Sequence, residues 1–220
     1  MSARKLTIGM IDFTDKCVVL KISDYRENDR LAKVLTATHG MVAVLLRGVK
    51  KTKAKLKPFA QEFAVFDTRL TANKGVFLTP IEPLLIQDGF SLCTDLKVFT
   101  AASVSAEATV AALGDDEPHT QVFVEFLKLL KELQPNCDPY YQAAVYMTRL
   151  LKLTGFYREY TYSDEPLTPV QMLGLAQKKG YEKAPDRDLS RRALKYICSE
   201  FQRNFDIGLK SVDSIDLYGK

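Results

Sequence analysis

The sequence predicts an α+β protein in which a small five-stranded β-barrel precedes an all-helical domain. The first observation is a change of period. Apolar residues alternate, as in strands, up to Pro80 and Pro83, and then recur with the 3.6-residue period of helices. The second is a change of charge, from a balance of +8 over residues 1–80 to −4 over residues 81–220. Because the two changes coincide, we expect two domains with different partners.

The domain boundary is placed near Leu85, where the strand pattern ends. This gives a barrel domain of residues 1–85 and a helical domain of residues 86–220. The whole chain carries a formal net charge of +4, so the basic character belongs to the barrel domain. A polyanion is therefore expected to bind there.

Alternating apolar residues, rich in Val, Ile, Leu and Thr, predict the strands of the barrel. Their expected ranges are Cys17–Ser23, Leu31–Thr38, Met41–Gly48, Glu62–Leu70 and Gly75–Leu84. The last two are expected to form a hairpin, because Asn73 and Gly75 suit a loop of that length. Five short strands with one long basic connection are typical of a Greek-key barrel of the OB type, and the spacing alone also fits an SH3-like barrel.

Five segments of the second domain have the apolar period of helices. The expected helices span Leu92–Leu113, Pro118–Gln134, Pro139–Thr154, Pro169 up to Gly180, and Leu189–Phe205. A carboxylate before Pro118 is expected to cap the second helix. Thr168 and Gln171 resemble a capping box at the start of the fourth, and Gly180 suits its end.

The composition is that of an ordinary soluble protein, with 46% apolar and 26% charged residues. No apolar run reaches the roughly 18 residues that a membrane span needs, and Met1–Asp15 lacks the apolar stretch of a signal peptide. We therefore expect no membrane association and a cytoplasmic location. The four cysteines are far apart in the sequence, so no local zinc site is predicted.

A strongly basic segment between the third and fourth expected strands is the main candidate binding site. Its cations are Arg47, Lys50, Lys51, Lys53, Lys55 and Lys57, and no carboxylate lies between them. Such cations neutralise successive phosphates and release condensed counterions, so a nucleic-acid backbone is the expected ligand. Gly48 would let the main chain bend close to that ligand. The alternative is a solvated loop that only keeps the protein soluble.

Neighbouring residues extend this candidate site. Arg26 and Arg30 lie in the polar connection between the first two strands and are expected to lengthen the phosphate track. The alternative for this connection is a solvated turn, because it mixes cations with carboxylates. The rings of Tyr25, Phe59 and Phe63 are candidates for stacking against a base.

The residues that usually carry catalysis are poorly placed in the sequence. His39 and His119 have no local partner for nucleophilic chemistry, and the glycine-rich phosphate-binding motifs are missing. The carboxylates of Asp115–Glu117 could bind Mg²⁺ in a nuclease, but Pro118 beside them favours helix capping. We therefore expect no enzyme activity, no metal and no cofactor.

Three segments resemble the RecO family of bacterial DNA-repair proteins. Asp24–Arg30 resembles the family's D-Y-x-E-x-D stretch after the first strand. Leu35–Val42 and Leu46–Lys51 resemble its L-T-x-x-x-G and x-[KR]-G-x-[KR]-[KR] blocks. Gly208–Ser211 resembles its closing L-K-S. The motifs follow one another along the barrel, whereas the helical domain matches in pattern more than in residues.

The resemblance implies an N-terminal OB fold and a helical C-terminal domain. It also implies a non-catalytic protein that binds single- and double-stranded DNA, anneals complementary strands and helps to load RecA onto SSB-coated DNA in RecF-type recombination. Its partners would be RecR, the C-terminal tail of SSB and, indirectly, RecA, in the bacterial cytoplasm near the nucleoid. The family's phosphate-contacting cations correspond to Arg47, Lys50 and Lys51, with the remaining lysines of the basic segment as extensions.

Two departures from the family pattern affect these expectations. Many members carry a four-cysteine zinc module after the middle helix, whereas Phe156–Asp186 contains no cysteine, so no zinc is expected. In several members the middle helix begins with Arg next to an aromatic residue, which would anchor the acidic SSB tail. Tyr140 and Tyr141 occupy that place here, and Arg149 and Lys152, one or two turns later, become the candidate partner-binding residues.

Two other functions are considered beside the DNA-binding mediator. In a protein-interaction adaptor, the helical domain would dock a partner and the basic barrel would bind an acidic peptide. In a metal-dependent nuclease, the carboxylates of Asp115–Glu117 would bind Mg²⁺. The mediator is favoured because the one-sided charge of the barrel suits a phosphate backbone.

Overall fold

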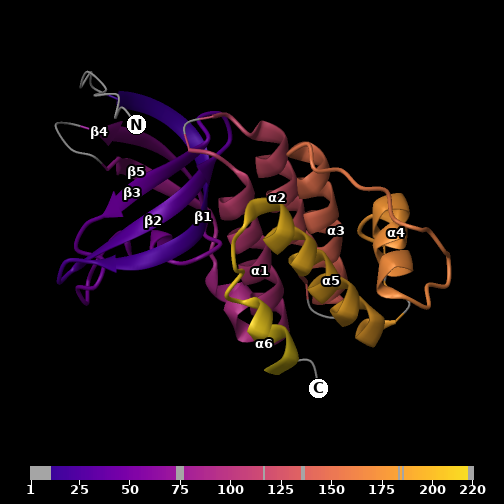
Figure 1. Cartoon of the computed structure of the whole chain (residues 1–220). Helices are drawn as coiled ribbons and strands as arrows, with labels where there is room; N and C mark the ends of the chain where they lie inside the picture. Colours follow the sequence, from indigo (N-terminus) through magenta and orange to yellow (C-terminus); the bar gives the residue numbers. More distant parts are fainter. Residues whose placement is uncertain are drawn as a thin grey trace.

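The computed structural model places a β-barrel beside a group of helices (Figure 1). The described residues are 11–72, 77–115, 117–134, 137–182, 184 and 186–217. Helix α1 (Leu96–Ala112) stands next to the barrel, and helix α4 (Pro169–Lys179) lies farthest from it. The predicted α+β class, with an OB-type barrel followed by helices, is confirmed.

Five strands of the described residues form one antiparallel sheet in the order β3-β2-β1-β4-β5. They are β1 (Ile11–Tyr25), β2 (Asp29–Thr36), β3 (Met41–Leu46), β4 (Val65–Ala72) and β5 (Thr79–Gln87). The sheet closes where Leu78, just before β5, pairs in parallel with Val44 of β3. The Leu45 N–H donates to the Leu78 carbonyl at 2.8 Å. This closure pairs backbone groups that an open sheet edge would leave exposed.

Strand β1 is buried on both faces over Cys17–Leu20. Cys17 and Val19 point into the interior of the barrel and belong to the barrel core. Val18 and Leu20 point to the other side and belong to the core that the barrel shares with the helices. Because successive side chains of a strand point to opposite faces, one strand joins the two hydrophobic cores.

The helical core is built around helix α3 (Pro139–Leu153), which packs against α1, α2, α4 and α5. The other helices of the described residues are α2 (Thr120–Glu132), α5 (Arg187–Phe205) and α6 (Val212–Leu217). Tyr146 of α3 is fully buried, and its hydroxyl hydrogen bonds with Thr109 Oγ1 of α1 at 2.6 Å. This bond satisfies a polar group that would otherwise be costly to bury.

The predicted starts of α3 and α4 are confirmed. Asp138 caps α3 immediately before Pro139. Thr168 and Gln171 form the expected capping box at α4, and Gly180 ends that helix with a φ of 65°. These starts depend on residues only a few positions apart, so the local sequence determines them.

Two other predicted helix starts are wrong. Helix α1 begins at Leu96, later than the predicted Leu92, because the carboxylate of Asp95 accepts the first free N–H groups. Helix α2 begins at Thr120 and has no side-chain cap, whereas a start at Pro118 was predicted. Among the described residues, His119 and not Asp115 or Glu117 holds the N-cap position of this helix.

The segment before α2 contacts the barrel instead. Asp115 forms an ion pair with Lys33 of β2 at 3.1 Å. The main chain of Glu117 lies so close to Gly40 that a Cβ added at Gly40 would come within 2.3 Å of the Glu117 carbonyl oxygen. Gly40 also has a φ of +76°. The turn between β2 and β3 thus needs glycine both for its conformation and for this contact.

The strands on both sides of the predicted hairpin pair as expected, β4 with β5. The tip of that hairpin, with Asn73 and Gly75, lies outside the described residues. Within the described part of the chain, no helix is both long enough and apolar enough to cross a membrane.

A buried carboxylate ties β1 to the turn after β2. Asp15 is 8% exposed, and its Oδ2 accepts hydrogen bonds from the Thr38 N–H and Oγ1 at 2.9 Å. The His39 Nδ1 lies 2.8 Å from the same oxygen, and the His39 ring stacks on Phe13. Burial raises the pKa of the Asp15 carboxyl, but the hydrogen bonds from His39 and Thr38 outweigh burial and leave the pKa below its ordinary value.

We predict that Asp15→Asn lowers the free energy of unfolding near neutral pH by about 1–3 kcal/mol, because a buried acceptor is lost. Since the pKa is depressed in the folded state, the carboxylate stabilises the fold above its ordinary pKa. That stabilisation is lost as the pH falls through the folded pKa. Urea unfolding at about pH 7 and about pH 3 should show a smaller difference at the lower pH. Equal differences at both would contradict a role for the ionised form.

Candidate nucleic-acid interface

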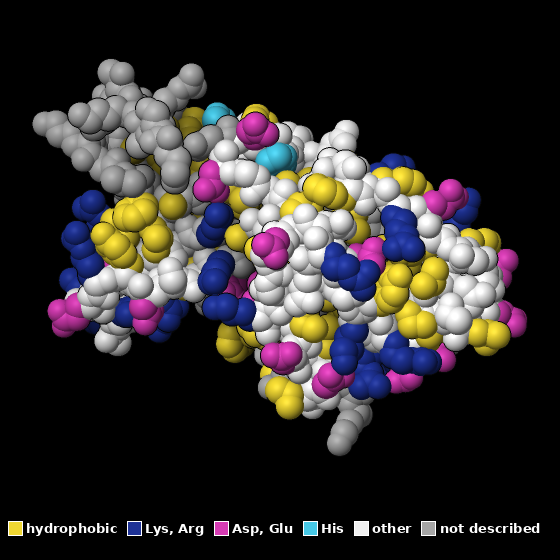
Figure 2. Space-filling view, viewed as in Figure 1, with side chains coloured by type: hydrophobic (Ala, Val, Ile, Leu, Met, Phe, Trp, Pro, Cys, Tyr) yellow, Lys and Arg dark blue, Asp and Glu magenta, His cyan; other side chains and the backbone are white. Residues whose placement is uncertain are grey.

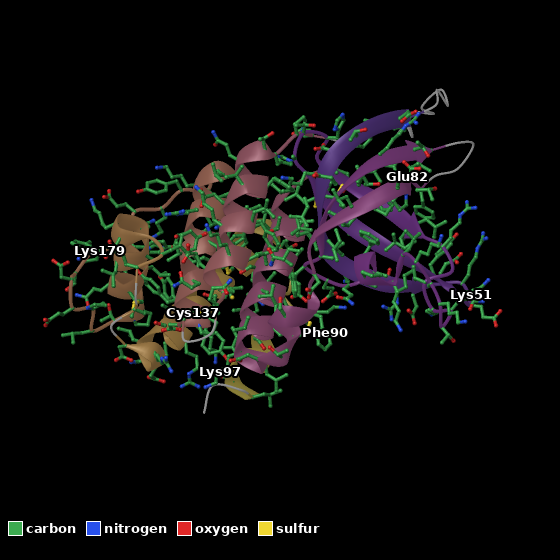
Figure 3. All side chains as sticks on the ribbon, turned by 180° about the vertical axis from the view of Figure 1, so that it is seen from behind. Lys51, Glu82, Phe90, Lys97, Cys137 and Lys179 are labelled. Carbon is green, nitrogen blue, oxygen red and sulfur yellow. The ribbon has the colours of Figure 1, made fainter. Side chains whose placement is uncertain are left out.

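The basic segment forms a loop after β3, at the end of the barrel away from the helices, where Figure 3 labels Lys51. Val49, Phe59 and Ala60 are buried in the barrel core, and Leu56 packs against it. These side chains anchor the loop at both ends, because burying each large one contributes about 1.5–3 kcal/mol. The charged residues between the anchors are left in solvent.

Successive turns shape the loop between these anchors. The N–H groups of Lys51, Ala54 and Lys57 donate to the carbonyl groups three residues earlier, at 3.1, 3.2 and 3.2 Å. Gly48 has a φ of +66°, which favours glycine, and its N–H donates to Asp29 Oδ1 at 2.7 Å. The start of the loop is thereby fixed against the connection between β1 and β2.

Five cations of the loop are exposed and form no ion pair with any other described residue. They are Arg47, Lys51, Lys53, Lys55 and Lys57. We call them the loop cations. Because no carboxylate of the described chain neutralises them, they are available to an external anion, and their number within one loop suits successive phosphates.

Arg26 lies across a shallow hollow from Arg47 and Lys51. The hollow separates the β1–β2 connection from the start of the loop, and its other lining residues are Glu27, Asn28, Asp29 and Gly48. Arg26 has a φ of 53°, and its guanidinium carbon lies 5.3 Å from the centre of the Tyr25 ring. The structure thus brings three of the predicted cations to one depression.

Two predicted cations share one carboxylate. The Lys50 Nζ lies 3.0 Å from an oxygen of Asp24, and the Arg30 Nε lies 3.4 Å from the other. The hydrogen bond from Lys50 holds the pKa of Asp24 below its ordinary value. Arg30 also donates to the Ala60 carbonyl at 3.1 Å. Lys50 and Arg30 therefore hold the loop to the β1–β2 connection and are less available than the loop cations.

The predicted stacking role of Phe59 and Phe63 is wrong, because both rings are buried. Phe59 meets Phe66 edge-on inside the barrel, and Phe63 meets Phe99 of α1 in the same way. Tyr25 remains a candidate, since it is only half-buried and lies beside Arg26. Neither Phe59 nor Phe63 lies in a strand, so strand alternation gave no indication of the side to which each points.

Arg149 and Lys152 of α3 make contacts within the helical domain. Arg149 forms an ion pair with Glu125 of α2 at 2.5 Å and lies over the Tyr181 ring at 4.6 Å. The Lys152 Nζ lies 5.5 Å from the centre of the Tyr157 ring. Arg149 therefore links three segments of the fold, and the partner-binding role of both residues stays a prediction.

A hollow at the start of α3 contains cations that the local sequence did not associate with this helix. Its lining includes Tyr140 of α3 together with Arg187 and Arg191 of α5. Arg191 pairs with Asp188 at 2.8 Å, whereas Arg187 is exposed. Because α5 is far from α3 in the sequence, only the packing of the two helices places these cations beside an aromatic residue.

No group of three His, Cys, Asp or Glu side chains that could hold a metal ion occurs among the described residues. Asp115 pairs with Lys33, and Asp116 lies outside the described part of the chain. The His39 Nδ1 lies within hydrogen-bond distance of the neighbouring Thr38 Oγ1 and of Asp15, which is distant in the sequence. The described residues therefore give the nuclease alternative no support.

We predict that Phe59→Ala destabilises the protein by about 3–5 kcal/mol, as for other buried aromatic side chains. The reason is that Phe59 anchors the basic loop in the barrel core. Thermal or urea unfolding measures the loss. The matched control is Lys55→Ala on the same loop, which should change stability by no more than about 0.5 kcal/mol. Similar stability for both variants would refute the anchoring role.

Two models of one protein family match the chain, and each covers one of its parts. The model described as Recombination protein O N terminal matches residues 10–82, and the model described as Recombination protein O C terminal matches residues 93–162. The first range covers β1 to β4 and the beginning of β5, and the second covers the helices from α1 to α3.

Curated proteins similar to this chain carry the name of the same family. The protein named DNA repair protein RecO of Clostridium novyi is 31% identical over 146 residues, which are 66% of this chain and 56% of the relative. Proteins of the same name are 29% identical in Clostridium perfringens, over 63% of this chain and 56% of the relative, and 28% identical in Bacillus subtilis, over 66% and 57%. The chain thus spans little more than half the length of these relatives. With both models matched in order on its barrel and its helices, the chain belongs to the RecO family of DNA repair proteins.

Proposed function

We propose that this protein binds single- and double-stranded DNA through its basic loop and anneals complementary strands without catalysing a reaction. The observation that carries this proposal is the row of exposed loop cations, which are unpaired among the described residues. Each can replace a condensed counterion on a phosphate. The loop would therefore bind the backbone of any sequence.

The remaining cations near the loop contribute in different ways. Arg26 faces Arg47 and Lys51 across the hollow, so a phosphate bound there would contact cations from two segments. Lys50 and Arg30 form exposed ion pairs with Asp24, which contribute little to stability. A bound phosphate can therefore take the place of that carboxylate.

The family resemblance extends the proposal to recombinational repair. The relatives are named as DNA repair proteins. We infer that this chain acts with RecR and helps to load RecA onto SSB-coated DNA in the cytoplasm, near the nucleoid. Such a role breaks no covalent bond, and surface cations on a rigid barrel suit it.

The salt dependence of DNA binding tests the loop directly. We predict that Lys51→Ala with Lys53→Ala weakens binding of single strands similarly for all sequences. Two lost phosphate contacts should make the slope of log affinity against log salt shallower by about 1.4. Fluorescence anisotropy of labelled oligonucleotides over a range of salt concentrations measures this slope.

The control for this experiment removes the same charge elsewhere. Lys128→Ala with Lys131→Ala, on the later turns of α2, should leave the slope unchanged. A wild-type protein that shows no single-strand binding at low salt would refute the proposed function. An equal effect of both double variants would show that net charge, and not the loop, determines binding.

We also propose that the hollow at the start of α3 binds the acidic C-terminal tail of SSB. Arg187 and Arg191 of α5 line this hollow with Tyr140 and supply cations that α3 itself lacks at this place. Its lining also includes Lys97 and the carboxylates of Asp95, Asp138 and Asp188. An exposed guanidinium near an aromatic ring suits a peptide that ends in a carboxylate beside an apolar side chain. Arg149 and Arg191 each form an ion pair with a carboxylate, so Arg187 is the cation that we expect to contact the peptide.

We predict that Arg187→Ala weakens binding of a synthetic SSB tail peptide by about threefold to fivefold, the effect of one partly exposed charge. Titration calorimetry with the full chain measures the affinity. Arg192→Ala is the matched control, since Arg192 lies on the same helix and pairs with Asp188. Equal affinities of the wild type and the Arg187 variant would argue against this location.

The adaptor alternative is favoured by one feature, a mostly apolar hollow between the barrel and the helices. Leu20, Phe99, Val110 and Ile207 are among its lining residues. In an adaptor, this hollow would dock a partner, and the basic loop would bind an acidic peptide. Partner capture that survives nuclease treatment, together with gel shifts that show no DNA binding, would support it over the mediator.

A further inference from the structure

Two lysines face each other on the outer surface of the barrel, away from the basic loop. Lys21 of β1 and Lys33 of β2 are direct partners in the strand pairing, and such partners lie on the same face of the sheet. Ala32 and Val34, the neighbours of Lys33, point into the barrel core, so Lys33 and its strand partner Lys21 point outward. Figure 2 shows basic side chains in a row along the boundary between the barrel and the helices.

This pair is unfavourable unless an anion lies near it, because like charges directly opposite each other destabilise a sheet. Lys33 has one partner, Asp115, at 3.1 Å, but the pair is exposed and contributes little. Lys21 forms no ion pair with any described residue. Glu62, whose carboxylate interacts electrostatically with Lys21, and Asp115 offset part of this repulsion, and an external anion would relieve the remainder.

A third lysine reaches the same place from the helical domain. Lys21 borders the mostly apolar hollow between the barrel and the helices, to which Lys210, between α5 and α6, also contributes. Glu62 and Glu107 lie in this hollow too. Burial raises the pKa of Glu62, whereas the hydrogen bond from the Ile22 N–H and the charge of Lys21 lower it, and Glu107 accepts hydrogen bonds from the Ser211 N–H and Oγ at 3.0 and 3.1 Å. We call Lys21, Lys33 and Lys210 the boundary lysines.

The boundary lysines are separate from the loop cations. Three uncharged residues on neighbouring strands lie between the two groups. Ser23 of β1 pairs with Leu31 of β2, and Leu31 pairs with Leu45 of β3. The loop begins four residues after Ala43, the strand partner of Lys33. At roughly 3.3 Å per residue, the two groups are about 13 Å apart along β3. This distance is comparable with the ~12 Å width of the major groove, which separates the two backbones of a DNA duplex.

We propose that the boundary lysines hold the backbone of a second DNA strand while the loop cations hold the first. The inference rests on the proposed function and adds to it a site for the complementary strand. Two strands whose phosphates are neutralised on separate surfaces can approach each other with less repulsion between their backbones. The ligand is a sugar–phosphate backbone of any sequence.

A triple variant of the full chain tests this second site, with Lys21, Lys33 and Lys210 each replaced by Ala. We expect the affinity for a short single strand to stay within about twofold of the wild type, because the loop cations are intact. The rate of annealing of two complementary labelled strands should fall about tenfold. The salt slope for binding a second strand to the saturated complex should become shallower by about 2, for three lost phosphate contacts.

The outcomes separate this inference from the proposed function. The control variant, with Lys128, Lys131 and Lys178 replaced by Ala, has the same net charge and should anneal like the wild type. If the wild type neither binds nor anneals DNA, the proposed function itself fails. If the wild type anneals and the triple variant anneals equally well, only the second-strand site is wrong. A loss of single-strand affinity as large as the loss of annealing would mean that the boundary lysines merely extend the first site.

Thermal unfolding distinguishes binding from a structural role. Lys21→Ala removes a like-charge repulsion, so the Tm without DNA should stay the same or rise. Lys21→Arg keeps the charge and should anneal like the wild type. A Tm that falls in the Ala variant, or slow annealing by the Arg variant, would overturn the assignment of Lys21 to the second strand.

Discussion

Burial of strand β1 on both of its faces connects the two halves of the protein. Cys17 and Val19 fill the barrel core, while Val18 and Leu20 fill the core shared with the helices. Burying each Val or Leu contributes about 1.5–3 kcal/mol, so moving the helices off the barrel would expose surface that stabilises both. The helices are therefore confined to one side of the barrel, and α1 lies directly against it (Figure 1).

The position of the helices on one side of the barrel determines which of its charged side chains are exposed to solvent. The end of the barrel away from the helices carries the loop cations, and its buried anchors Val49 and Phe59 hold the loop in place. The side covered by helices leaves only its margin exposed, and there the outward residues of β1 and β2 are Lys21 and Lys33. Because the helices cover one side of the barrel, its accessible cations include those of the loop at the far end and Lys21 and Lys33 on the margin. The acidic balance of the helical domain would direct a polyanion to the barrel.

Features that depend on a few neighbouring residues could be predicted from the sequence. The strands follow from alternation, the start of α4 follows from Thr168 and Gln171, and the basic loop follows from a run of cations. Features that depend on distant segments could not. Phe59 points inward because its loop crosses the barrel, and α2 begins at Thr120 because the preceding residues contact the turn after β2. Likewise, the placement of Arg187 beside α3 depends on helix packing, which has no local signal.

The kind of cation on the two surfaces is itself informative about mechanism. Four of the five loop cations are lysines, and all three boundary residues are lysines. Arginine offers a planar fork that favours one bidentate geometry, whereas lysine is a compact, hydrated point charge on a flexible stem. A surface of lysines therefore binds phosphates without fixing their register. The proposed annealing requires that freedom, because two strands must shift along each other until their bases match, while the barrel would keep both backbones neutralised and close.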